Sequence, residues 1–444
     1  MSIILSRHSQ LAIAIIVLSL FAVNSIRATT LEEVVESALQ NSEQLSALRA
    51  GVEGAVWKQR AIARADLPLL TADAGWRHQT EVPQVEMAMD DIPPPIGPLQ
   101  LSFPLGVSDN YDTGLQASWL AFSGFAKSAQ KQIGRLQIEQ QREQLEIATQ
   151  EIALHTVQLY RTSQLLSLQA AVLESGRDRV RNNIRRLRNL VVNNLVTPLD
   201  TLALVLVIND YDRQYLQLYG KMVAAQNALN LLAGVTVEVE SYSEDSSINL
   251  IHPLLYTEDN PRLTQHEHEI LILKQQLRQL NSSCYPRVNL FAGWRWGRPG
   301  LNQTRDEWMN YGIVGAQASW ILWDGGIRHR LSKSIEAAET AQKEQLTGAT
   351  RKLQTEYDNA LVLYHTEEEQ LELLEENLSL TQQQLDGLEV RLQQGDISGS
   401  DLRDHLLELT RVETEVVIVR LQLALRRTEI EKLSGLAPAE WSLQ

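Results

Sequence analysis

Cysteine, proline, glycine and positive charge are all scarce in this 444-residue chain. The single cysteine, Cys284, excludes an intrachain disulfide and any zinc site built from several thiolates. Only 13 prolines and 23 glycines are present, which favours long uninterrupted elements. The 40 Lys+Arg against 55 Asp+Glu give a formal net charge of −15. This balance argues against binding of duplex nucleic acid, because that affinity comes largely from cations that neutralise phosphates.

The chain also lacks a hydrophobic run of the ~20 residues that a membrane-spanning helix needs. Its longest apolar run, residues 11–23, follows Arg7 and precedes the small residues Ser25 and Ala28. This order is typical of a secretory signal peptide, and we expect residues 1–28 to be removed. If the mature protein enters a membrane it must do so as β-strands, since lipid leaves no water to satisfy exposed backbone groups.

An internal duplication organises the rest of the chain. Residues 116–119 and 317–320 both read Gln-Ala-Ser-Trp, and the same offset maps Gly234 onto Gly435 without a gap. We therefore predict two repeats, 29–234 and 260–436, each ordered as helix, strand, strand, very long helix and returning helix. An acidic segment, 235–259, joins them, and a tail, 437–444, follows. The predicted strands lie at about 66–78, 109–122, 285–297 and 310–323, and the long helices at about 124–193 and 325–393.

The first repeat is longer than the second at one place, between its two strands. Residues 77–115 carry nearly half the prolines of the protein, whereas the matching stretch, 295–316, is much shorter. We expect this insertion to be an extended, proline-stiffened loop, because loops are where insertions are tolerated.

The long helices carry the 3,4 spacing of a coiled-coil seam. In the first repeat the seam comprises Val180, Ile184, Leu187 and Val191, and in the second Leu371, Leu374, Leu378, Leu385, Leu388 and Leu392. A helix of roughly 70 residues would be about 100 Å long at ~1.5 Å per residue. Elements of this length predict a tube or rod of helices and not one compact globule.

The strands alternate between an apolar and a polar face. Residues 288, 290, 292, 294 and 296 are apolar and end in two tryptophans. Residues 287, 289, 291, 293 and 295 form the other face, which is polar or small except for Phe291. This is the pattern of a transmembrane barrel wall, although a soluble sheet packed on helices would alternate in the same way. Four strands cannot close a barrel, for which about eight is the minimum, so several copies must share one.

These features together resemble the TolC-like family of outer-membrane efflux proteins. The resemblance extends from about Leu31 to Leu436. It rests on the duplicated unit, the strand-to-helix junctions at 119–124 and 320–326, the turns with a small-residue-x-x-Asp pattern, and the Leu-x-Gly endings at Gly234 and Gly435. Each motif is weak alone, but their order and their repetition are specific.

The resemblance implies a mainly helical homotrimer in which four strands per subunit build a 12-stranded transmembrane barrel. A long helical barrel would continue it across the periplasm from the outer membrane of a Gram-negative-type bacterium. Family members are passive exit ducts of tripartite efflux pumps or type I secretion systems. They dock on a periplasmic membrane-fusion adaptor that connects to an inner-membrane transporter. No enzyme activity, cofactor or nucleic-acid partner is implied.

The family closes the periplasmic tip like an iris and lines it with acidic residues. The matching residues are Asp200, Asp401 and Asp404. Three copies of each would form rings that attract cations and raise the pKa of some members. The alternative for Asp200 and Asp401 is helix capping. Relatives can lock the tip with a Tyr and an Arg, but the matching positions are Leu392 and Ile397, so a closed state must be held otherwise.

The two turns at the tip are candidates for contact with the adaptor, because they lie at the exposed ends of the helix pairs. Thr197 is expected to N-cap the first returning helix, and Ser398 or Ser400 the second. The full set of contact candidates is Asn194, Leu195, Val196, Thr197, Gly395, Asp396, Ile397 and Ser398.

Other chemistry finds no support in the sequence. His266 and His268 are two residues apart, so on a helix they point to different sides and cannot chelate one metal ion together. No catalytic residue or metal site is predicted. The remaining alternative to a channel is a periplasmic coiled-coil scaffold or tether without a pore.

Overall fold

The structure, a computed structural model, describes residues 29–89, 99–193, 195–242, 260–303, 305–394 and 397–443. The predicted signal peptide, residues 1–28, lies outside this range. Two compact units are present. The helical unit comprises the described residues up to Ala50, 143–264 and from Thr347 onward, and the strand unit comprises 51–142 and 265–346. The predicted fold class is confirmed, since the chain is mainly helical and carries one four-stranded sheet.

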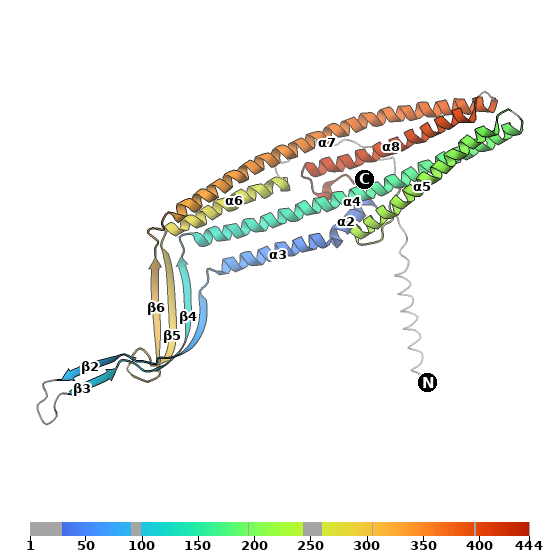
Figure 1. Ribbon diagram of the computed structural model, residues 1–444. Coiled ribbons are helices and arrows are strands. Elements are labelled where there is room, and N and C mark those ends of the chain that lie inside the picture. Colours follow the sequence, from blue (N-terminus) through green and yellow to red (C-terminus); the bar gives the residue numbers. More distant parts are fainter. Residues whose placement is uncertain are drawn as a thin grey trace, which may run out of the picture. The chain divides into compact units, whose positions relative to one another are not determined.

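The strand unit contains an antiparallel sheet in the order β1-β4-β5-β6 (Figure 1). β1 (Leu69–His78) pairs with β4 (Asp109–Phe122) within the first repeat. β5 (Arg287–Arg298) pairs with β6 (Met309–Ser319) within the second, and β4 pairs with β5. The two strand pairs of the duplication therefore join into one continuous sheet.

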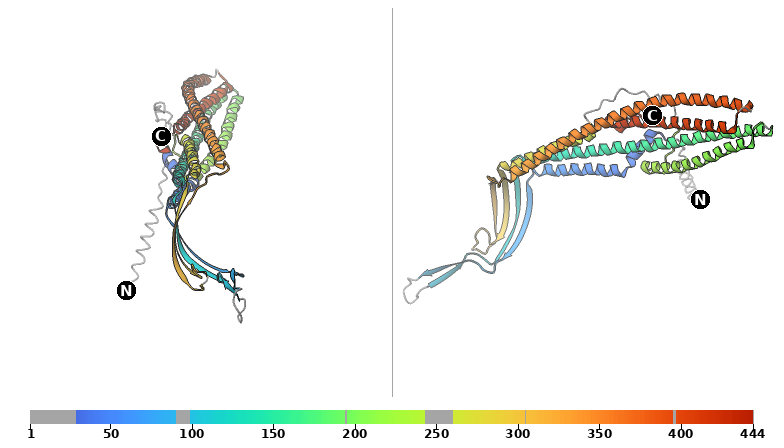
Figure 2. Two further views of the ribbon diagram at one scale, coloured as in Figure 1. Left: turned by 90° about the vertical axis from the view of Figure 1, so that its left-hand side faces the viewer. Right: turned by 45° about the horizontal axis from the view of Figure 1, so that its top comes forward.

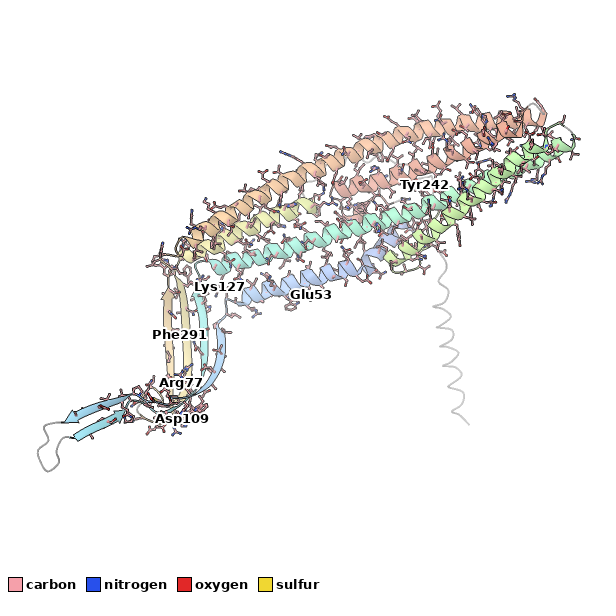
Figure 3. The ribbon with its side chains drawn as sticks, viewed as in Figure 1. Glu53, Arg77, Asp109, Lys127, Tyr242 and Phe291 are labelled. Atoms are coloured by element: carbon pink, nitrogen blue, oxygen red, sulfur yellow. The ribbon has the colours of Figure 1, made fainter. Side chains whose placement is uncertain are left out.

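The two faces of this sheet differ as the alternation predicts. On the apolar face Trp294 is 59% and Trp296 is 51% exposed. On the polar face Arg295 donates to Asp73 of β1 at 3.0 Å and also pairs with Asp112 of β4. Phe291, labelled in Figure 3, covers Gly315 of β6 so closely that a Cβ there would clash with the ring. The apolar side chains thus point out of the unit, while charged groups pair on the other face.

The insertion between β1 and β4 forms a second, two-stranded sheet, so the expectation of an extended loop was wrong for this part. β2 (Gln84–Met89) and β3 (Leu99–Pro104) are antiparallel neighbours in Figure 1. Apolar residues occupy matching register positions, and the hydroxyl of Ser102 donates to the side-chain oxygen of Gln84 at 2.5 Å. Residues 90–98, which hold the four central prolines, lie outside the described range.

Two helices far longer than the rest follow the strands. α4 (Ala126–Val192) has 67 residues and α7 (Ile327–Gln394) has 68. Asp324 caps α7 by accepting the backbone N–H of Gly326 at 2.9 Å and that of Arg328 at 3.0 Å. The other helices are α2 (Leu31–Asn41), α3 (Glu43–Arg64), α5 (Pro198–Ala233), α6 (Pro261–Asn281) and α8 (Gly399–Leu433), with short 3₁₀ turns at Ser282–Cys284 and Pro438–Glu440.

One core cluster of the helical unit contains residues from near both ends of the described chain. Val34 of α2, Val157 of α4 and Leu229 of α5 are each 0% exposed and pack together. Trp441 and Leu443 of the C-terminal tail lie in the same cluster, as does Val237 of the predicted inter-repeat segment. The remainder of that segment, residues 243–259, and Gln444 lie outside the described range.

A second core cluster lies where four long helices converge near the turns. The right view of Figure 2 shows α4 with α5, and α7 with α8, as two antiparallel pairs. Their buried side chains are Leu173, Val180, Ile184, Leu187, Leu204, Val207, Tyr211, Leu385, Leu392, Leu402, Leu406 and Leu409. Val180, Ile184, Leu187, Leu385 and Leu392 belong to the predicted seams, which are therefore confirmed at this end of the helices.

No helix in the described part of the chain is both long and apolar enough to cross a membrane.

Candidate gate at the helix turns

The turn from α4 to α5 is organised by the carboxylate of Asp200. Thr197 is the N-cap of α5, and Pro198 follows it at the first helical position. Asp200 Oδ2 accepts the backbone N–H of Thr197 at 2.9 Å and its hydroxyl at 2.6 Å. The side chain thus reaches back to a donor that the helix itself leaves without an acceptor, which is a capping-box arrangement.

The turn from α7 to α8 repeats this arrangement with Ser398 and Asp401. Asp401 Oδ2 accepts the backbone N–H of Ser398 at 3.1 Å and its hydroxyl at 2.8 Å. The backbone N–H of Asp401 in turn donates to Ser398 Oγ at 3.3 Å. Two of the three aspartates predicted as gate residues, Asp200 and Asp401, therefore take part in helix caps.

Asp200 makes one further bond that Asp401 does not. Its second oxygen, Oδ1, accepts the backbone N–H of Gly399 at 2.9 Å, so that one carboxylate joins the two turns. Gly399 is buried, and a Cβ built on it would lie 2.8 Å from Asp200 Cβ and 2.9 Å from the Asp200 carbonyl carbon. Only glycine allows this approach of the two helix starts.

Further contacts connect the two helix pairs away from the turns. The hydroxyl of Tyr211 on α5 donates to Thr410 Oγ1 on α8 at 2.8 Å. Gly176 of α4 permits this packing, because a Cβ there would lie 2.9 Å from Thr410 Oγ1. Arg179 of α4 forms two bonds to Glu413 of α8, at 2.9 and 2.5 Å.

These polar contacts extend to α7. Asn183 donates to Glu389 Oε1 at 2.9 Å, and Arg186 pairs with Glu389 Oε2. All of these bonds surround the buried cluster of the four helices. The turn aspartates therefore sit at the end of an interface that is apolar inside and paired by charge at its edges.

The electrostatics favour ionised aspartates at both turns. Partial burial raises the pKa of Asp200, but the hydrogen bonds from the Thr197 hydroxyl and from the backbone of Gly399 and Thr197 outweigh it, so the pKa lies below its ordinary value. The hydroxyl and then the backbone N–H of Ser398 likewise lower the pKa of Asp401. Hydrogen bonds within one chain thus lower the pKa values of Asp200 and Asp401. Repulsion between the same aspartates of neighbouring subunits would act in the opposite direction and raise them.

Asp404, the third gate candidate, has a different environment. It lies one turn further along α8, is 66% exposed, and takes no part in the cap. Its Oδ1 pairs with the guanidinium of the adjacent Arg403 at 2.8 Å. Asp404 is therefore an exposed carboxylate with a cation beside it.

The positions of the family's polar lock are apolar and packed. Leu392 is 0% exposed within the cluster of the four helices, and Ile397 packs against the same cluster. Neither side chain offers a polar group. The bond from Gly399 to Asp200 connects the two turns by a backbone donor instead.

The adaptor-contact candidates differ in accessibility. Leu195 is 55% exposed and Thr197 is exposed, whereas Val196, Ile397 and Ser398 are partly buried. Val196 and Ile397 pack against the four-helix cluster. Asn194, Gly395 and Asp396 lie outside the described residues.

Gly399 was not among the residues predicted for the site. The duplication offers a signal, because it aligns Gly399 with Pro198, so that one turn has the residue without a backbone N–H where the other has the residue without a side chain. Only the turn with Gly399 can donate a bond across to the other aspartate without a steric clash.

The described residues contain no group of three His, Cys, Asp or Glu side chains able to hold an ion. His266 Nδ1 lies 2.8 Å from the side-chain nitrogen of Gln342 on α7, so it takes part in helix packing.

A family model described as "Outer membrane efflux protein" matches residues 255–436, a stretch that contains the predicted second repeat, 260–436. The second half of the chain is therefore similar to the family of outer-membrane efflux proteins. Proteins of that family are outer-membrane channels that span into the periplasm. No curated protein matches the sequence.

Solved structures share the fold of this chain at low sequence identity. CusC is 15% identical, covers 92% of both chains and has a TM-score of 0.76. VceC from Vibrio cholerae is 16% identical over 92% of this chain and 96% of its own, with a TM-score of 0.73. The open state of MtrE from Neisseria gonorrhoeae is 15% identical over 93% of both chains, with a TM-score of 0.72.

Proposed function

We propose that three copies of this chain form the exit duct of a tripartite efflux pump or type I secretion system. TolC-like channels are trimers that act with pump partners. Each copy contributes its four-stranded sheet to a shared 12-stranded barrel, and the long helices continue it into the periplasm. The apolar face with Trp294 and Trp296 meets lipid, while the face with the Arg295 ion pairs lines the pore.

The gate of this duct lies at the two helix turns. The observation that carries the assignment is the single carboxylate of Asp200, which caps α5 and holds the first residue of α8. This bond keeps the two helix pairs of one subunit together at the tip. In the trimer, Asp401 and Asp404 present further carboxylates, so that the closed tip prefers cations.

The exposed parts of the turns bind the membrane-fusion adaptor. Leu195 and Thr197 are the most accessible of the described contact candidates. An adaptor that engages them would act directly beside the Asp200 bond. Docking and opening are thereby coupled in one place, because any shift of α5 against α8 changes the geometry of that bond.

Planar bilayers with purified protein test the gate. The double variant Asp401→Asn, Asp404→Asn should lose part of the cation preference of the channel. Asp178→Asn is the matched control, since Asp178 is a 70% exposed carboxylate of α4 away from the turns. A selectivity that is the same in the double variant and the wild type removes the two residues from the gate.

The pore itself is tested by extraction and conductance together. A channel stays in outer membranes that are washed with alkali and then conducts ions after reconstitution. A scaffold without a pore would leave the membrane on washing and would not conduct.

A further inference from the structure

The β2–β3 hairpin has one face that is entirely apolar. Val85 lies opposite Phe103, and Met87 lies opposite Leu101, so these four side chains share one face. Val85 is 41%, Met87 50% and Phe103 49% exposed, although each is a large hydrophobic residue. The opposite face carries Gln84, Glu86 and Ser102. An isolated two-stranded hairpin is marginally stable in water, so an apolar face of this kind is expected to have a partner.

The base of the hairpin lies over the polar face of the four-stranded sheet. Val82, Pro83 and Leu105 line a cavity of about 580 Å³ together with Asp112 and Arg295. Gly106 is close to the 299–308 connection as well, because a Cβ on it would lie 4.0 Å from the carbonyl oxygen of Gln303. Figure 3 marks Arg77 and Asp109 at the end of the sheet from which the hairpin emerges. The hairpin therefore begins mainly beside the charged face of the sheet, although Trp76 of the other face also lines the cavity.

We infer that the apolar faces of the hairpins from different subunits pack against one another at the outer end of the channel. The inference rests on the proposed trimer, whose pore is lined by the polar face of the sheet. Three hairpins that start on that face are brought to one place, at a high local concentration. The partner of Met87 and Phe103 is then a second copy of the same face.

The negative charge of the hairpin is consistent with a second copy of the hairpin as its partner. Residues 79–108 contain Glu81, Glu86, Asp90 and Asp91 but no Lys or Arg. Anionic lipid headgroups would repel such a segment, which argues against a lipid surface as its partner. Glu86 lies on the face opposite Met87, so packing of the apolar faces leaves this carboxylate in water. Burial of the apolar faces thus requires no burial of the Glu86 charge.

Disulfide cross-linking between subunits tests the inference. Cys284, the single cysteine, is first replaced in a Cys284→Ser background, in which Met87→Cys and Glu86→Cys are made separately. The two positions are adjacent in β2 but point to opposite faces. After mild oxidation in the outer membrane, Met87→Cys should give a covalent dimer on a heated, non-reducing gel, with one subunit of each trimer left unlinked. Glu86→Cys should give none.

An unheated gel of the same samples separates this inference from the proposed trimer. A trimer band without a covalent dimer of Met87→Cys overturns the packing of the hairpins and leaves the channel intact. Loss of the trimer band in the Cys284→Ser background overturns the trimer itself.

A second measurement does not depend on cross-linking. Phe103→Asp, which places a charge on the apolar face, should separate the hairpins and raise the single-channel conductance. Ser102→Asp, on the opposite face, should leave the conductance unchanged. Equal conductance of the Phe103 and Ser102 variants would contradict the inference.

Discussion

Asp200 accepts the backbone N–H of Gly399, and these two residues, 199 positions apart in the chain, join the starts of the two returning helices. The bond matters because side chains at the usual lock positions, Leu392 and Ile397, are packed in the apolar core. A carboxylate that caps its own helix is already fixed in orientation, so the additional bond to Gly399 needs little further ordering. The hydrogen bond that connects the two helix pairs is therefore made by a residue that also caps a helix. It requires glycine at position 399.

Asp200→Ala should loosen the tip. It removes the acceptor of Thr197 and of Gly399 together, and loss of a helix cap alone costs about 1 kcal/mol. We expect the open probability in planar bilayers to rise. Asp200→Asn retains an oxygen able to accept the Gly399 N–H and should lie between the wild type and Asp200→Ala. If the alanine and asparagine variants conduct as the wild type does, the bond does not hold the tip closed.

Gly399→Ala tests the close approach from the other side. The new Cβ would meet the backbone of Asp200, so α5 and α8 must separate at their first turns. Gly387→Ala on α7 is the control, because nothing lies within 4 Å of its Cβ position. The first variant should conduct more and the second should not differ from the wild type, as single-channel recordings can determine.

The pH dependence of the closed state follows from the lowered pKa values of Asp200 and Asp401. A carboxyl whose folded pKa is depressed stabilises the fold fully above its unfolded pKa of about 3.9 and loses this effect as pH falls through the folded pKa. Conductance should therefore be constant from neutral pH to about pH 5 and rise only below about pH 4. Asp200→Asn should show a weaker rise. A transition near pH 6 would point to a histidine instead.

The buried side chains next to the turns should contribute more to the stability of the helices than exposed side chains do. Leu392→Ala removes a side chain that is 0% exposed, and such truncations cost about 2–5 kcal/mol. Leu373→Ala on the same helix truncates a side chain that is 61% exposed, and surface substitutions of this kind usually stay within about 0.5 kcal/mol. Circular dichroism during heating should show earlier loss of helix for the first variant alone. Equal melting would mean that the packing around Leu392 is replaced within the trimer.

Much of the fold could be predicted because periodic patterns extend over long segments. The seam of Val180, Ile184 and Leu187 is buried as its spacing indicates, and the alternating faces around Arg295 and Trp296 are those expected. The β2–β3 hairpin was missed because its prolines suggested a loop, while the pairing of Val85 with Phe103 spans an insertion that no repeat duplicates.

The candidate site was predicted in its residues but not in its contacts. The small-residue-x-x-Asp pattern marks Asp200 and Asp401, and their capping boxes follow from local spacing of three residues. Nothing local indicates that Asp200 reaches Gly399, since that bond depends on where α8 begins in space relative to α5.

The sequence by itself determined the duplication, the four strands, the long helices and the two capped turns, because each depends on interactions between residues close in the chain or on a repeated pattern. The tertiary structure decided which turn donates to which carboxylate, and on which side of the sheet the hairpin begins. Both depend on the packing of segments that are distant in sequence. In such close packing, a displacement of about an ångström determines whether there is room for a Cβ atom or whether a hydrogen bond can form.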